Sequence, residues 1–460
     1  GIVGRFGPGT DEHRLRAATK QLAHRGPDGE GTWFAPSGAA ALGHRRLAIL
    51  DLSPAAAQPM VSPDGHVAVS FNGEIYNFRE LREHLRHDWS FRSTGDTEVL
   101  IAGYQKWGLD GLMSRIRGMF AFALWDDLKR RGYLVRDRLG IKPLYYHLSG
   151  DACTFASEAK ALFPLLDADF ELDECALISL TAHLWLPDPG TVWKGIQRLC
   201  PAEYLEFTSG QTRIHRYWNP LEISAPNSAN IDDAASELRA LLELAIAEEM
   251  ISDVPIGAYL SGGVDSTAIV SQMTRLTRHP VTTYTIAFSA EDQRFEVTDP
   301  DREYAHFAAK FFSCDHHEIV ATPRMTDLLP RLLWHLDEPV ADPAAINTYL
   351  IAAHAYDSGI RVLLSGMGAD EVFGGYRKYR AVLMARQFRK APVLIQEALR
   401  RTTSALPVAT QAGGLRGLRW ARRFLAAVQN DEFETFMAMG TYCAKDRLRR
   451  LCGGAPFDYD

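Results

Sequence analysis

Several features that mark other classes of protein are missing from this sequence of 460 residues. No uninterrupted apolar run reaches the roughly 20 residues that a helix needs to cross a bilayer, and no basic segment followed by an apolar one leads the chain. The formal net charge of −7 argues against the broad basic face of a protein that coats nucleic acid. We therefore expect a cytoplasmic protein that binds neither membranes nor nucleic acid.

Cysteine is scarce and irregularly placed. Its six occurrences lack the CxxC spacing of zinc-binding and redox motifs, so they predict reduced thiols rather than a disulfide or zinc framework. Hydrophobic residues make up 46% and charged residues 23% of the chain, as is usual for a globular protein. A chain of this length exceeds one ordinary hydrophobic core, which predicts two domains.

The two halves of the chain differ in their hydrophobic pattern. Up to about residue 200, short β-like runs such as 66–78 and 118–127 follow one another closely, and helical spacing occurs only at 10–25 and 77–85. Close spacing of many strands predicts antiparallel sheets, and the two helices make the first half an α+β layered domain.

The second half alternates strands with helices instead, which is typical of a parallel sheet covered by helices. Its predicted strands end at residue 260 and lie at 281–289, 316–321 and 361–366. A polar, turn-rich stretch between about 205 and 230 separates the two patterns. We therefore predict an α+β domain over 1–210 and an α/β domain over 211–460.

The stretch YLSGGVDSTAIV (259–270) carries the sharpest chemical pattern. A buried strand ends, two glycines turn the chain, and a helix begins, so that backbone N–H groups and the helix dipole can hold an anion. No Lys follows, which distinguishes it from the GxxxxGK[ST] phosphate loop. It resembles the SGGxDS loop of ATP pyrophosphatases, although a plain glycine-rich turn is the structural alternative. The residues expected at the nucleotide are Leu260, Ser261, Gly262, Gly263, Asp265 and Ser266.

A second strand-end loop, within 361–379, pairs naturally with the first. It contains Ser365, Gly366 and an acid, Asp370. Ligands of parallel sheets bind at the carboxyl ends of the strands, so Asp265 and Asp370 are predicted to hold Mg²⁺ on the pyrophosphate of ATP. Leu260 and Ile286 are predicted to line the adenine pocket, with ordinary sheet core as an equal alternative.

Many ordered motifs together resemble the glutamine-dependent (class B) asparagine synthetase family over nearly the whole chain. The resemblance implies an N-terminal-nucleophile glutaminase domain, with two antiparallel sheets between helix layers, followed by an ATP-pyrophosphatase synthetase domain with a parallel sheet. The motifs include HRGPDGEG (24–31), FNGEIYN (71–77), TGDTEVL (94–100), RDRLGIKPLYY (136–146), SDVPIGAYLSGGVDS (252–266), DEPVADPAA (337–345) and SGMGADEVFGGY (365–376).

The resemblance also assigns a glutamine site. Arg46 is expected to bind the α-carboxylate, and Glu74 and Asp96 the α-amino group, since a free amino acid needs a charged partner at each end. Asn72 and the backbone N–H of Gly73 are expected to form the oxyanion hole, because a tetrahedral acyl intermediate needs preorganised donors. His24 and His44 are expected to be structural, because this type of glutaminase uses no histidine base.

The family's nucleophile is an N-terminal cysteine directly before Gly-Ile-Val-Gly, whose thiolate attacks the glutamine amide. This sequence begins with that glycine, Gly1, so we expect the cysteine immediately in front of it. Three explanations are open: the cysteine carries a covalent modification, it has been removed, or the protein lacks it by nature and uses free ammonia. The complete set of glutamine-binding residues favours the first two explanations.

One departure from the family pattern concerns the acceptor. The second loop of asparagine synthetases usually reads SGEGxDE, but Met367 stands at the position of the Glu. A thioether can neither take up a proton nor pair with an ammonium ion. The acceptor is therefore predicted to be a carboxylic acid other than aspartate, either a small molecule or a peptide. The family's C-terminal catalytic Lys cannot be assigned, because no matching segment is found.

The predicted function is amidation of that acid through an acyl-adenylate, with glutamine as the source of ammonia and release of AMP, pyrophosphate and glutamate. Three alternatives stay open: asparagine synthetase proper, an adenylating cyclase that forms a lactam and keeps a vestigial first domain, and a non-catalytic regulator. A homodimer is a further possibility that the sequence does not decide.

Overall fold

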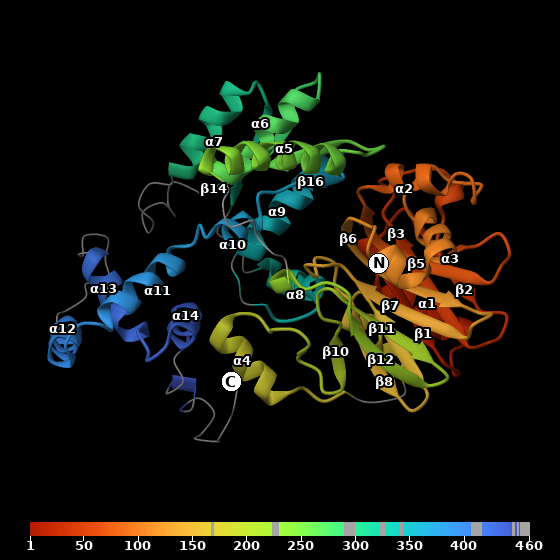
Figure 1. Ribbon diagram of the computed structural model, residues 1–460, viewed down its shortest axis with the longest axis horizontal. Coiled ribbons are helices and arrows are strands. Elements are labelled where there is room, and N and C mark those ends of the chain that lie inside the picture. The colour runs from red at the N-terminus through yellow and green to blue at the C-terminus, as the bar shows by residue number, and fades with distance from the viewer. Residues whose placement is uncertain are drawn as a thin grey trace. The chain divides into compact units, whose positions relative to one another are not determined.

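The computed structural model describes residues 1–166, 170–222, 230–288, 300–321, 327–340, 342, 344–405, 416–443, 447–448 and 450 (Figure 1). The chain divides into two units. Unit 1 contains Gly1–Leu177, Leu186–Pro255 and Trp334–Glu338, and unit 2 contains Ile178–Trp185, Ile256–Leu333 and Pro339–Asp460. Within the described part, no helix is long and apolar enough to span a bilayer.

Unit 1 is built around two six-stranded sheets in which every strand pairing is antiparallel, as predicted. The first sheet has the order β10 (Ile196–Arg198), β8 (Tyr145–Ser149), β9 (Ala152–Ala156), β1 (Ile2–Phe6), β3 (Ala40–Arg46) and β2 (Gly29–Phe34). The second has the order β12 (Gln211–Arg216), β11 (Glu203–Thr208), β7 (Arg131–Arg136), β6 (Gly118–Asp126), β5 (Val67–Ile75) and β4 (Met60–Val61).

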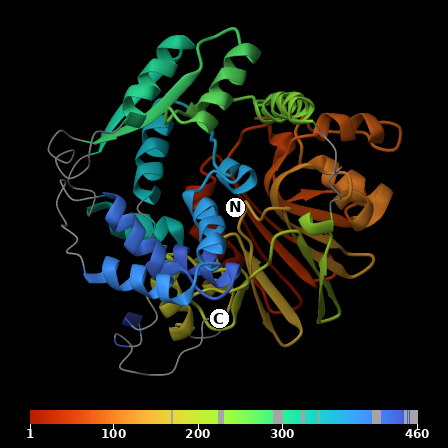
Figure 2. The same cartoon turned by 60° about the vertical axis from the view of Figure 1, so that its left-hand side comes forward.

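Strand β6 shows how the sequence pattern produces the layers. Ala121, Ala123 and Trp125 pack in a core with Phe6 and other residues of the first sheet. The alternate residues of β6 pack instead in a second core with helices α2 (Phe78–Leu85) and α3 (Glu98–Met113). Since successive side chains of a strand point to opposite faces, one strand joins the sheet–sheet core to the helix–sheet core. Figure 2 shows the two sheets, red to yellow-green, with orange helices outside them.

The opposite face of the first sheet is covered by α1 (Glu12–Gln21), whose Ala18 packs with Val3 and Ala156. Unit 1 therefore has the predicted order of helix layer, sheet, sheet and helix layer. One helix of this unit, α3, was not predicted. Its residues 99–102 are all buried. The sequence therefore has a continuous apolar run there and lacks the 3.6-residue spacing of apolar positions by which a helix is recognised.

Unit 2 contains the predicted parallel sheet, in the order β15 (Asp315–Ala321), β14 (Thr282–Phe288), β13 (Ile256–Tyr259) and β16 (Val362–Leu364). Helices α6 (Val264–Leu276), α7 (Pro300–Phe311) and α9 (Ala344–Asp357) alternate with these strands along the chain. Unit 2 also contains α10 (Ala369–Phe373), α11 (Arg377–Phe388), α12 (Val393–Ala405), α13 (Arg416–Ala427) and α14 (Glu432–Gly440). Helix α5 (Ile231–Glu249) belongs to unit 1, and the residues of α4 (Glu174–His183) and α8 (Leu329–Leu336) are divided between the two units.

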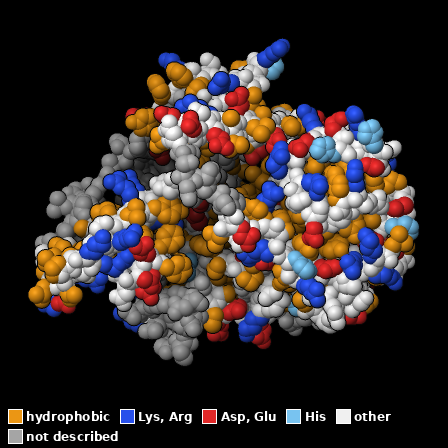
Figure 3. Space-filling view, in the orientation of Figure 1, with side chains coloured by type: hydrophobic (Ala, Val, Ile, Leu, Met, Phe, Trp, Pro, Cys, Tyr) orange, Lys and Arg blue, Asp and Glu red, His pale blue; other side chains and the backbone are white. Residues whose placement is uncertain are grey.

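Two sequence predictions concern residues that lie outside the described part. Residues 223–229 of the predicted boundary zone lie there, and unit 1 includes β12 beyond residue 210, so the boundary between 210 and 211 stays a prediction. Cys452 also lies there, whereas five cysteines of the described part are free. On the face of unit 1 drawn in Figure 3, Lys and Arg side chains lie among Asp and Glu side chains.

Candidate active sites

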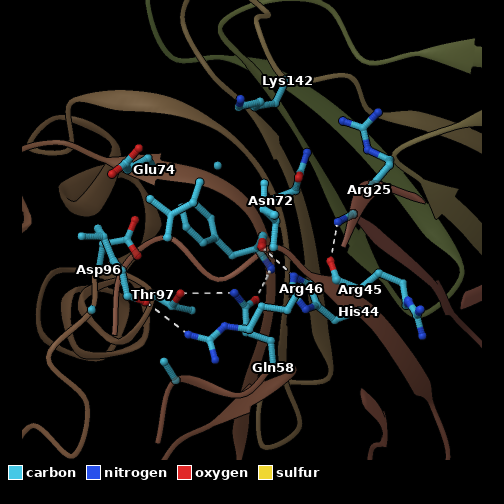
Figure 4. A pocket seen from close by; sticks show the side chains of 18 of the residues that line it. Arg25, His44, Arg45, Arg46, Gln58, Asn72, Glu74, Asp96, Thr97 and Lys142 are labelled. Atoms are coloured by element: carbon cyan, nitrogen blue, oxygen red, sulfur yellow. Dashed lines mark hydrogen bonds between the residues drawn. The ribbon is translucent and has the colours of Figure 1, made fainter. Parts of the chain in front are cut away.

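A cavity of ≈ 360 Å³ in unit 1 brings together the five residues that were predicted to bind glutamine (Figure 4). They come from the end of β3, from β5 and from the loop before α3, which are far apart in the sequence. The volume lies near the lower limit of small-molecule pockets, which suits a ligand of amino-acid size. The five residues are Arg46, Asn72, Gly73, Glu74 and Asp96.

Two carboxylates form the acidic side of this cavity. In Figure 4 the side chains of Glu74 and Asp96 lie beside each other, and Asp96 accepts a hydrogen bond of 2.8 Å from the backbone N–H of Ile75. Burial and the charge of Asp96 raise the pKa of Glu74 to about 8. Burial also raises the pKa of Asp96 to about 6, against the effect of its hydrogen bonds. A bound ammonium group would relieve both effects, since an opposite charge favours the ionised carboxylate.

Arg46 supplies the basic side. Its guanidinium donates hydrogen bonds to the carbonyl oxygens of Leu50 at 3.2 Å and Ser53 at 3.3 Å, and also to that of Asp51. These bonds fix its direction. Among the described residues, no carboxylate lies within ion-pair distance of Arg46, so its charge is available to an anionic ligand group.

Asn72 has the property expected of an oxyanion-hole donor. Its Nδ2 atom is buried and has no hydrogen-bond partner, which is unfavourable until a ligand oxygen accepts from it. The neighbouring Gly73 has a φ of 155°, and a Cβ atom there would lie 2.2 Å from the carbonyl oxygen of Met119. Only glycine therefore allows the backbone this position next to Asn72.

Both histidines near the cavity have protein partners. His44 is buried, and its Nε2–H donates to the carbonyl oxygen of Phe71 at 3.0 Å. Burial holds the pKa of His44 well below its usual value, so the ring is neutral. His24 shares a hydrogen bond of 2.9 Å with Glu158. These contacts agree with the structural roles expected for the two rings.

Further cavity residues were missed by the sequence reasoning. Gln58 accepts from the N–H of Phe71 at 2.7 Å and donates to Thr97 at 3.3 Å, so it joins β5 to the start of α3. Nothing in the sequence around Gln58 indicated this role. Lys142 also lines the cavity, and its place within the motif RDRLGIKPLYY could have identified it.

The predicted nucleotide loop lies in unit 2 between β13 and α6. Ser261 and Ser266 share a hydrogen bond of 3.0 Å between their hydroxyl groups, which closes the loop. Gly262 has a φ of 74°, and a Cβ atom there would lie 2.5 Å from the backbone nitrogen of Ala305. Gly263 is the N-cap of α6. The loop therefore presents the N-terminus of a 13-residue helix, which suits an anionic ligand.

The structure brings the two predicted loops of unit 2 into contact. Strands β13 and β16 pair in parallel, so their carboxyl ends lie at the same edge of the sheet. A Cβ atom on Gly366 would lie 2.9 Å from the Cβ of Asp265 and 3.0 Å from the nitrogen of Ser266. The loop that contains Ser365 thus meets the loop of Asp265, and Asp370 lies in the first turn of α10.

The carboxylates of Asp265 and Asp370 fit Mg²⁺ only if phosphate oxygens of a bound nucleotide complete its ligands. Mg²⁺ in nucleotide sites is usually held by one or two carboxylates together with phosphate oxygens, and Asp265 and Asp370 supply two. The described residues contain no group of three or more His, Cys, Asp or Glu that would hold a metal ion alone.

Three other predicted residues have clear surroundings. Leu260 is buried. Ile286 packs against the core cluster of Tyr284 and Ile351, which is the structural alternative to an adenine-binding role. Met367 is 85% exposed, and its N–H donates to the hydroxyl of Ser365 at 3.2 Å. The thioether of Met367 is therefore exposed, and its role toward an acceptor stays a prediction.

Comparisons with known proteins agree with this arrangement. Residues 1–218 match the family model of the glutamine amidotransferase domain, and residues 237–450 match that of asparagine synthase. A putative glutamine-hydrolysing asparagine synthetase from Mycobacterium bovis is 38% identical over 411 residues, which is 85% of this chain and 61% of that protein. The chain thus spans about three fifths of the length of this relative.

The match to a second relative covers a larger share of that protein's length. A putative glutamine-hydrolysing asparagine synthetase from Methanocaldococcus jannaschii is 32% identical over 442 residues, 91% of this chain and 82% of that protein. Among solved structures, a glutamine phosphoribosylpyrophosphate amidotransferase from Bacillus subtilis covers 70% of this chain and 81% of its own, with 16% identity and a TM-score of 0.38. The chain belongs to the glutamine-hydrolysing asparagine synthetase family.

Proposed function

We propose that the chain is a glutamine-dependent ligase that forms an amide from a carboxylic acid at the expense of ATP. Residues 1–210 would hydrolyse glutamine, and residues 211–460 would activate the acid. The observation that carries this proposal is the cavity of unit 1, in which a cation, two carboxylates and the unpaired donor Asn72 surround a space of amino-acid size.

In the glutaminase half, the α-ammonium group of glutamine lies between Glu74 and Asp96, and its α-carboxylate pairs with Arg46. The thiolate of a cysteine bonded to Gly1 attacks the side-chain amide carbon, with the free α-amino group as base. Gly1 lines the cavity, which supports a nucleophile at this place. Asn72 and the Gly73 N–H stabilise the oxyanion. Ammonia then leaves, and water hydrolyses the thioester to glutamate.

In the synthetase half, the loop 261–266 binds the pyrophosphate of ATP, with Ser365 and Gly366 beside it. Mg²⁺, held by Asp265 and Asp370, would neutralise charge on the phosphates. The carboxylate of the acceptor attacks the α-phosphorus atom, and pyrophosphate leaves. Ammonia then attacks the acyl carbon of the adenylate, and AMP leaves as the amide forms. Leu260 and Ile286 would contact the adenine ring.

The acceptor is proposed to be an acid other than aspartate. Met367 offers an apolar, exposed side chain at the place where the family has a carboxylate, so it favours an acceptor with apolar surface near its reacting group. The family name of the relatives makes aspartate the natural comparison substrate.

The proposal is tested with the full-length chain, including any residue in front of Gly1. Glutamate release is measured together with the intact mass of the N-terminus, and pyrophosphate exchange into ATP is measured against a panel of carboxylic acids. Glutamine hydrolysis and exchange with a non-aspartate acid support the proposal. Efficient conversion of aspartate to asparagine overturns the proposed acceptor. Product formation without added ammonia or glutamine indicates a cyclase instead.

A further inference from the structure

The segment that leads into the nucleotide loop begins in the glutaminase unit. The motif SDVPIGAYLSGGVDS starts at Ser252 and belongs to the region matched by the asparagine synthase model. Residues 251–255 nevertheless fold with unit 1, and the second segment of unit 2 begins at Ile256, the first residue of β13. Asp253 therefore lies in unit 1 only eight residues before Ser261 of the nucleotide loop.

Asp253 is bonded to the loop that holds Arg46. Its carboxylate accepts a hydrogen bond of 2.7 Å from the backbone N–H of Asp51. Its own N–H donates to the carbonyl oxygen of Ile49 at 3.0 Å. Both Ile49 and its neighbour Leu50 line the glutamine cavity. The two bonds therefore fasten the edge of the cavity to this short segment.

Asp51 connects the two ends of the cavity. Its carboxylate accepts from the N–H and the hydroxyl of Ser53, at 3.0 Å and 2.5 Å, and from the N–H of Thr94 at 2.6 Å. Its carbonyl oxygen accepts from the guanidinium of Arg46. Thr94 is two residues before Asp96. Asp51 thus fixes the cationic end through its carbonyl and the acidic end through its carboxylate.

The backbone of Asp51 has an uncommon conformation that its hydrogen bonds hold in place. Its φ is 52°, in the left-handed region that residues other than glycine adopt infrequently, Asp and Asn more readily than most. The residue is 7% exposed, and hydrogen bonds fix its N–H, carbonyl and carboxylate groups. A strained conformation persists where the surrounding contacts over-determine it, and the N–H bond to Asp253 is one of these contacts.

We propose that Asp253 is a positioning residue for the glutamine-binding site, acting through Asp51 on Arg46 and Asp96. The short segment 251–255 of unit 1 thereby helps to hold the two charged ends that bind glutamine. The proposal rests on glutamine being the ligand of this cavity. It concerns the affinity for glutamine rather than the chemical step, because the hydrogen bonds of Asp253 go to the loop of Ile49 and Asp51.

The test compares the full-length chain with its Asp253→Ala variant. Loss of one hydrogen bond to a charged acceptor is expected to raise the KM for glutamine about tenfold, with kcat within about twofold. ATP-dependent amide formation from ammonia should be unchanged. Asp253→Asn should recover most of the affinity, because an amide oxygen can still accept from Asp51. Asp233→Ala, which removes an exposed carboxylate in the first turn of α5, serves as the matched control.

Two results would overturn the positioning role. One is an unchanged KM in Asp253→Ala. The other is an equal loss of the glutamine- and ammonia-dependent activities together with a lower melting temperature, which indicates a general structural defect. Calorimetric titration with glutamine separates this proposal from the proposed function. A wild-type chain that binds glutamine without hydrolysing it refutes the hydrolysis, whereas equal binding by the wild type and Asp253→Ala refutes the positioning role.

Discussion

Glutamine binding should depend steeply on pH because of the carboxylate pair in the cavity. The pKa of Glu74 is raised to about 8 in the ligand-free protein, by burial and by Asp96. At pH 7 its carboxyl group is therefore mostly protonated. The α-ammonium group of glutamine binds the ionised form, so binding below pH 8 should release a proton.

The expected magnitude follows from the ionised fraction. Apparent affinity falls in proportion to the population of the competent form, so the KM for glutamine should rise about tenfold per pH unit below pH 8. The folding stability of the ligand-free protein should change with pH in the opposite direction. Because the folded pKa of Glu74 exceeds its ordinary value of 4.5, folding stability should decrease as the pH rises from about 4.5 toward 8. Bound glutamine should reverse this loss.

The assay is glutamate release at several glutamine concentrations between pH 6 and 9, together with calorimetry in buffers of different ionisation enthalpy, which counts the released proton. Glu74→Gln is the control. An amide cannot ionise, so this variant should bind weakly with a much smaller pH slope, to which only Asp96 contributes. A KM that is constant between pH 6 and 8, or binding without proton release, would show that the two carboxylates do not act as described.

Three further substitutions test other parts of the structure. Asn72→Ala should lower kcat for glutamate release about 10²- to 10³-fold with little change in KM, and an equal rise in KM would contradict an oxyanion role. Gly366→Ala should suppress pyrophosphate exchange while glutamine hydrolysis continues, because its Cβ would lie 2.9 Å from that of Asp265. Glu158 is 3% exposed and pairs with Arg25 at 2.9 Å, so Glu158→Gln should lower the free energy of unfolding by about 3 kcal/mol. Urea denaturation measures this value, and unchanged stability would show that the buried pair contributes little.

Much of the architecture could be predicted from local patterns. The β-like run at 118–127 predicted a strand where the structure has β6, and the glycine pattern after Leu260 predicted the strand–loop–helix unit that the structure contains. These features depend on residues that are neighbours in the sequence, for which side-chain periods of 2 and 3.6 are informative. Helix α3 was missed, because its buried residues form one continuous run and leave no helical period to detect.

Motifs and side-chain periods were enough to predict the family and the two kinds of sheet, and the motifs also led us to propose a set of glutamine-binding residues. The fold had to be known to see that Arg46 and Asp96 border one cavity, that burial and Asp96 raise the pKa of Glu74, and that Asp253 belongs to unit 1. The physical reason is range. Burial and charge–charge repulsion depend on residues that are distant in the sequence. The hydrogen bond between Asp253 and Asp51, for example, joins residues about 200 positions apart, and no local pattern contains that information.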